Sequence, residues 1–148
     1  MVTRPSTRVL VISAIALAGP SALGLDLVAR HFLFQNQPAN LRQFMAENVT
    51  HYAWFIVPLP LLGGLIGFFL YPSMRRSNLA RLGPSPAPML VQGADLKTLL
   101  LTTTCAQLPA LFGDVSVMLG GDLAPAICAT SISVLAVLAI GARSMLTR

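Results

Sequence analysis

The segment Leu99–Gly120, LLLTTTCAQLPALFGDVSVMLG, decides how this chain can fold. It is mostly apolar over about twenty residues, enough for a helix to cross a lipid bilayer, yet Gln107 lies near its middle and Asp114 two turns later. Both side chains therefore lie on one helical face, together with Thr103 and Ala110. Amide and carboxyl groups are costly in hydrocarbon unless they face protein, water or each other. The segment predicts a membrane helix that packs against neighbouring helices.

The composition places the whole chain in the membrane class. Only 10% of its 148 residues are charged and 55% are hydrophobic, with a mean hydropathy of +0.72, whereas soluble domains carry about 25% charged residues. The net charge of +5 does not indicate nucleic-acid binding, because the basic residues lie between apolar runs without interleaved aromatics. The lipid bilayer is therefore the first predicted partner.

Four membrane spans are predicted, at about 9–29, 53–72, 98–119 and 123–142. Residues 30–52 then form an outer loop and 73–97 a cytoplasmic connector, whose alternating prolines favour extended chain. Two glycines at the last turn favour a close helical hairpin. We expect a single all-α transmembrane domain over 1–148, an integral membrane four-helix bundle made of two antiparallel helical hairpins.

The first span has a second interpretation. Basic residues before the apolar run 9–19 also fit a secretory signal peptide, with Ala22 and Gly24 at a small-residue cleavage site. Apolar character continues past Pro20 to Val28, which is long enough to span, so we favour an uncleaved helix kinked at the proline.

Small residues recur at helical spacing on every predicted span. They let helix backbones approach closely, and the G-x-x-x-G of the second span is interpreted as close packing rather than as a dimerisation motif. The predicted packing residues are Ala14, Ala18, Ala22, Gly63, Gly67, Ala110, Ala129 and Ala136.

Aromatic residues mark the ends of the second span. Tyr52 and Trp54 stand at one end and Tyr71 at the other, as interfacial anchors do. Before them, residues 41–49 carry apolar side chains at helical spacing, which favours either a short amphipathic interface helix or a partly ordered loop.

The basic residues predict the orientation. Eight of the ten lie in the N-terminal tail, the 73–97 connector and the C-terminal tail, and the positive-inside rule places such segments in the cytoplasm. Both termini are then cytoplasmic, as an even number of spans requires, and the composition favours a bacterial inner membrane. The eight are Arg4, Arg8, Arg75, Arg76, Arg81, Lys97, Arg143 and Arg148.

No motif for catalysis, phosphate binding or metal coordination is present, so neither an enzyme nor a cofactor is predicted. His31 and His51 both fall in the outer loop without a cluster of acidic residues or cysteines. Cys105 and Cys128 would differ in depth by roughly 10–15 Å in an antiparallel pair, too far for a disulfide, and are interpreted as packing residues.

The intramembrane polar residues are the candidate site: Asp26, Gln107, Asp114 and Ser133. If the first and third spans are neighbours, the two carboxyls share a poorly hydrated region and one should bind a proton, which suits a proton or cation pathway. The alternative is that both face the headgroup layer. Gln107 is expected to join helices, and Ser133 can hydrogen-bond across.

Residues 98–142, with the run Thr104–Gly113 followed by a glycine turn and a small-residue helix, resemble the second hairpin of proteolipid (c-type) subunits of rotary ATPases. The resemblance implies hairpin architecture, but Gln107 stands where that family has its proton-carrying acid. The leading hypothesis is a non-enzymatic accessory or structural subunit of a larger membrane complex, associating with other subunits or itself. The rival is an ion-pathway subunit using Asp26 and Asp114, and a third class is a small membrane enzyme or lipid-binding protein.

Overall fold

The computed structural model describes residues 6–35 and 37–146, and the regular elements in these ranges are all helices, which confirms the all-α prediction. Arg4 and Arg148, counted above for the orientation, lie outside the described residues. The helices are α1 (Ser6–Phe34), α2 (Ala39–Ile56), α3 (Pro58–Ala80), α4 (Pro88–Met118) and α5 (Leu123–Leu146).

Three helical stretches are long and apolar enough to cross a membrane: Thr7–Phe34, Ala39–Ala80 and Leu123–Leu146. The second comprises α2 and α3, which are interrupted only at Val57, where Pro58 begins the next helix without a backbone N–H. The predicted span at 98–119 falls almost entirely in α4, which is not among the three stretches found in the described residues, so only three of the four predicted spans are confirmed as long and apolar enough.

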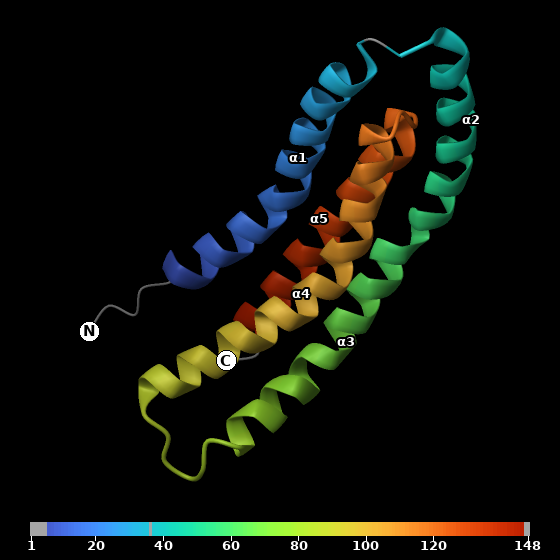
Figure 1. Cartoon of the computed structure of the whole chain (residues 1–148). Helices are drawn as coiled ribbons and strands as arrows, with labels where there is room; N and C mark the ends of the chain where they lie inside the picture. Colours follow the sequence, from blue (N-terminus) through green and yellow to red (C-terminus); the bar gives the residue numbers. More distant parts are fainter. Residues whose placement is uncertain (1–5, 36, 147–148) are drawn as a thin grey trace.

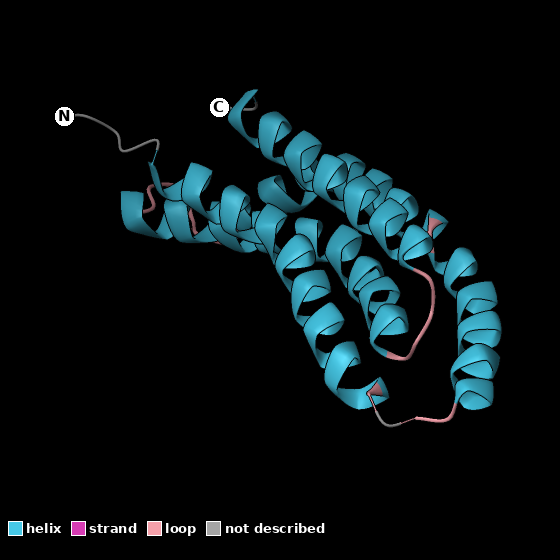
Figure 2. Cartoon of the chain, turned by 90° about the horizontal axis from the view of Figure 1, so that it is seen from above, coloured by secondary structure: helices cyan, strands magenta, loops and turns pink. Residues whose placement is uncertain are grey.

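Helix α4 lies at the centre of the fold and contacts α1, α2, α3 and α5. The α4–α5 pair packs directly, whereas α1 and α3 lie on opposite sides of that pair (Figure 1). The predicted first hairpin is therefore open, because α1 packs on α4 and α5 rather than along α3. Figure 2 shows the same helices from above, with short loops between them.

The helices extend further than the predicted spans. Helix α1 continues to Phe34 and α2 begins at Ala39, so most of the predicted outer loop is helical. Helix α3 continues through Pro72 to Ala80, and α4 begins at Pro88, which reduces the connector to residues 81–87. Proline suits the first turn of a helix, so α4 begins at Pro88, and its buried face begins at Asp95.

Glycines allow the backbones of α3 and α4 to pack closely. A Cβ atom added to Gly63 would collide with the carbonyl oxygen of Cys105, and one added to Gly67 would collide with that of Thr102. At the neighbouring Gly64, an added Cβ would lie 2.5 Å from the Cβ of Ala136 on α5. The G-x-x-x-G pattern thus serves packing within the chain.

The other small residues divide into two groups. Ala110 and Ala129 are fully buried, and Ala136 is partly buried between α3 and α5. Ala14 and Ala18 are exposed and Ala22 is half-buried, so the predicted packing face of α1 is wrong for contacts within this chain. The buried face of α1 carries Ile12, Ala16 and Gly19 instead.

Tyr52 and Trp54 are exposed, at 69% and 50%, as interfacial anchors require. Tyr71 is only 1% exposed and packs in the core, so its prediction as an anchor is wrong. It belongs to the same buried cluster as Leu99 of α4 and Ile140 of α5. Cys105 and Cys128 are free thiols on exposed faces, which contradicts their interpretation as packing residues.

Candidate functional site

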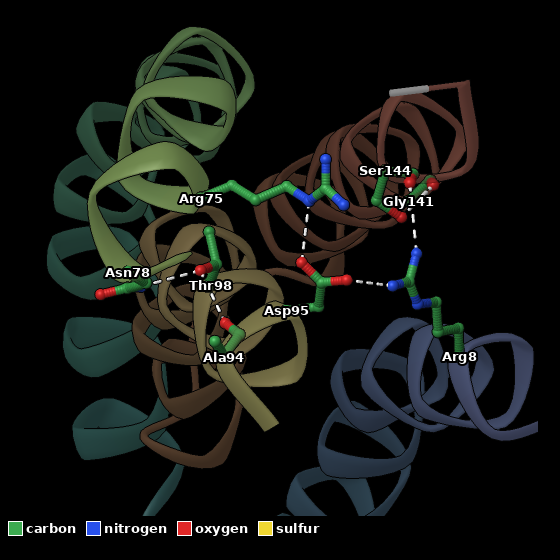
Figure 3. A network of polar contacts seen from close by, with 8 residues as sticks. All are labelled: Arg8, Arg75, Asn78, Ala94, Asp95, Thr98, Gly141 and Ser144. Atoms are coloured by element: carbon green, nitrogen blue, oxygen red, sulfur yellow. Dashed lines mark hydrogen bonds and ion pairs between the residues drawn. The ribbon is translucent and has the colours of Figure 1, made fainter. Parts of the chain in front are cut away.

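A buried carboxylate joins three helices at the end of the bundle where α1 begins and α5 ends (Figure 3). Asp95 of α4 is 3% exposed and forms ion pairs with Arg8 of α1 and Arg75 of α3, the latter with Nε 2.8 Å from Oδ1. Arg8 also donates from Nη1 to the backbone carbonyl of Ser144 on α5, at 3.5 Å. Asp95 therefore pairs with two arginines, and the cluster connects α1, α3, α4 and α5.

A second polar contact joins α3 to α4 beside this cluster. Asn78 donates to Thr98 Oγ1 at 2.8 Å, and Thr98 in turn donates to the backbone carbonyl of Ala94 (Figure 3). Thr98 is fully buried. Because each of these groups is satisfied inside the protein, the cluster fixes the register of α3 against α4.

Gln107 forms a second junction halfway along α4. Its Nε2 donates to the backbone carbonyl of Ile15 on α1 at 3.0 Å, and its Oε1 accepts from Ser133 Oγ on α5 at 2.7 Å. Gly19 makes room for this amide, since an added Cβ would lie 3.2 Å from Nε2. The structure thus brings together two of the sequence-selected polar residues and ties three helices through one side chain.

Asp114 lies two turns further along the same face and is fully buried. Its Oδ1 accepts a hydrogen bond of 2.7 Å from Thr130 Oγ1 on α5. Its Oδ2 is the only buried side-chain oxygen or nitrogen in residues 6–35 and 37–146 without a hydrogen-bond partner. A buried polar atom of this kind marks a position where a proton or another ligand would be stabilised.

Asp26 of α1 is half-buried. It and Asp114 lie on adjacent helices, since α1 packs against α4. A groove of about 320 Å³ between α1 and α5 runs alongside and is lined in part by Gly24 and Thr130, the residue that binds Asp114.

The sequence reasoning missed the Asp95 cluster because it assigned 73–97 to a solvated connector. A signal was available. The buried face of α4 continues from Thr103 to Leu99 and then Asp95 at four-residue intervals, as one continuous helix requires. The partners themselves, Arg8 and Arg75, were counted only as topology determinants.

In the described part of the chain, no group of three or more histidines, cysteines or acidic residues lies close enough to hold a metal ion. His31 and His51 are both exposed, and each stacks edge-on against neighbouring aromatic residues of its own helix.

Comparisons with family models, curated proteins and solved structures find no match to this chain. The fold and the site therefore define its class: an all-α protein with three helical stretches able to span a membrane and buried polar junctions on its central helix.

Proposed function

We propose that this chain is a multi-pass protein of the bacterial inner membrane with both termini in the cytoplasm, and that it serves as a non-enzymatic accessory or structural subunit of a larger membrane complex. The bundle has an end at which α1 begins, α5 ends and the α3–α4 connector turns (Figure 1). Arg8, Arg75 and Arg143 lie near this end, as the positive-inside rule requires of a cytoplasmic side.

The observation that carries the subunit role is the outward face of α1. Ala14, Ala18 and Ser21 are exposed one turn apart, between the exposed leucines Leu10 and Leu25. Small residues on an exposed helix face let a helix of another subunit approach closely. The contacts of α1 within the chain are made by Arg8, by Arg30 and by the backbone carbonyl that accepts from the Gln107 amide. The face with Ala14 and Ala18 is therefore available to a partner.

The test is the size of the complex after mild solubilisation. We expect crosslinking in membranes to trap the chain with a partner, and the Ala18→Leu variant to weaken that product because the larger side chain keeps a partner helix from approaching closely. Ala142→Leu, at an exposed position of α5, is the matched control and should leave the product unchanged. A monomer without any crosslinked partner would exclude the subunit role.

A second candidate function, a proton or cation pathway, is favoured by Oδ2 of Asp114, which is buried without a hydrogen-bond partner. A buried carboxylate oxygen without a donor is stabilised when it binds a proton or a cation. Gln107, which stands at the acidic position of the proteolipid resemblance, does not ionise and is engaged at both ends of its amide. A pathway here would depend on Asp114 instead.

Flux measurements separate this candidate from the first. In reconstituted vesicles, Asp114→Asn should abolish proton- or cation-dependent flux, whereas Asp122→Asn, an exposed acid in the α4–α5 turn, should not. Flux that is the same in the native protein and in the Asp114 variant would remove the pathway function.

A further inference from the structure

Arg30 and Arg42 are the only arginines or lysines in 30–52, and both line one cavity of about 470 Å³. The cavity lies between the end of α1 and the start of α2, at the turn between α4 and α5. His31 and Gln35 complete its polar wall, and Leu27 and Phe34 supply apolar surface. No carboxylate is among the described residues that line it.

Hydrogen bonds within the protein position Arg30 and the adjacent α4–α5 turn without a ligand. Arg30 donates from Nη1 to the carbonyl oxygen of Gly121 at 2.8 Å, which leaves its remaining N–H groups for other acceptors. The same turn is tied to α2, because the backbone N–H of Asp122 donates to Thr50 Oγ1 at 2.7 Å. Gly120 has a φ of +96° and lies against the Phe34 ring, where an added Cβ would be 3.1 Å from the ring.

We propose that this cavity binds a phosphate group, with Arg30 and Arg42 as its cationic ligands, and that the natural source is the headgroup of an anionic glycerophospholipid. Guanidinium groups match phosphate oxygens in paired hydrogen bonds, and the ring N–H of His31 adds a donor even when the ring is neutral. Leu27 and Phe34 would contact the apolar part of the lipid.

The positive-inside rule does not explain why these two arginines line the same cavity. The positive-inside rule depletes basic residues from the outer side, yet the two that remain there converge on one cavity. The cavity also falls within the size range of small-ligand pockets. This inference uses the proposed membrane location but is independent of the subunit role, so each can fail without the other.

The first experiment measures lipid binding to the purified full chain in detergent by native mass spectrometry, with phosphatidylglycerol and phosphatidylcholine as the probes. We expect the native protein to prefer phosphatidylglycerol, and Arg42→Gln to weaken that binding by roughly tenfold, as the loss of one charge-assisted pair implies. Arg76→Gln, an exposed arginine at the opposite end of the bundle that does not line this cavity, is the matched control.

A second arm distinguishes a lipid from a free anion. Stabilisation by millimolar inorganic phosphate that Arg42→Gln abolishes, without a preference between the two lipids, would support the phosphate site and assign it to a soluble ligand. Arg30→Lys, which retains a charge and a donor for Gly121, should fold and bind more weakly than the native protein. Equal binding of both lipids with no response to phosphate, or an Arg42 variant that matches the Arg76 control, would overturn the proposal.

Discussion

Arg75 of α3 and Asp95 of α4 form an ion pair near the α3–α4 connector, with Nε 2.8 Å from Oδ1. Arg8 of α1 pairs with the other oxygen of the same carboxylate. The Asp95 side chain is 4% exposed, whereas the side chains of Arg8 and Arg75 are 21% and 22% exposed. A buried anion between two partly solvated cations is therefore the point at which three helices are held together.

Removing this charge should destabilise the bundle. Asp95→Asn leaves two arginines close together with no anion between them. Breaking a buried ion pair costs about 3–5 kcal/mol, and the partial solvation of the arginines lowers the expectation to roughly 2–4 kcal/mol. The measurement is the free energy of unfolding in one detergent, or the shift of the thermal midpoint. Asp122→Asn, an exposed acid, is the control, and equal stability of the two variants would contradict the structural role of Asp95.

The Gln107 junction makes a prediction about coupling. Gln107→Leu and Ser133→Ala each remove the hydrogen bond between α4 and α5, so their effects on stability should not add. Interhelical hydrogen bonds of this kind contribute about 0.6–1.7 kcal/mol, which is the coupling energy expected from a double-mutant cycle. A cycle between Gln107→Leu and Thr104→Val, whose hydroxyl is exposed and bonds within α4, should give a coupling near zero. A zero coupling with Ser133 would argue against the junction.

The buried polar face of α4 could be predicted from the sequence because its spacing is local. Thr103, Gln107, Ala110 and Asp114 recur with the period of one helix, and all four are buried. What each one contacts depends on the rotation of other helices. Gln107 and Ser133 form a hydrogen bond through packing that residue spacing on α4 alone does not define.

Two predictions about individual faces failed for a related reason. The alanines of α1 repeat as regularly as those of α5, yet Ala14 and Ala18 face outward because Ile12 packs against Gly141 and Gly19 admits the Gln107 amide. Tyr71 looks like an anchor by its place at the end of an apolar run, yet it is buried in the core cluster that includes Leu99 and Ile140. The Arg8–Asp95 pair joins residues 87 positions apart, which no local pattern reveals.

The close approach of α3 to α4 predicts a sharp difference between glycines. Gly63→Ala places a methyl group against the backbone carbonyl of Cys105, which cannot move without separating the helices. Overpacking of this kind costs about 1–3 kcal/mol or more. Gly24→Ala is the control, because nothing lies within 4 Å of its added Cβ, and the change should be neutral or slightly stabilising through helix propensity. Thermal midpoints of the two variants in detergent check this. Equal stability would mean that the glycine seam is not a tight contact.

The orientation proposed for the chain predicts which engineered cysteines a water-soluble maleimide reaches in intact cells. Cys105 and Cys128 are exposed on helix faces and free, so both can be replaced by alanine to give a background without thiols. In that background, Asn40→Cys at the start of α2 should be labelled from outside the cytoplasmic membrane. Ser85→Cys, in the α3–α4 connector beside the arginine-rich end, should be labelled only after the membrane is opened, because basic segments remain in the cytoplasm. The reverse pattern would invert the topology and move the Arg30–Arg42 cavity to the cytoplasmic side. Labelling of both positions in intact cells would contradict a membrane-spanning arrangement with the two ends of the bundle on opposite sides.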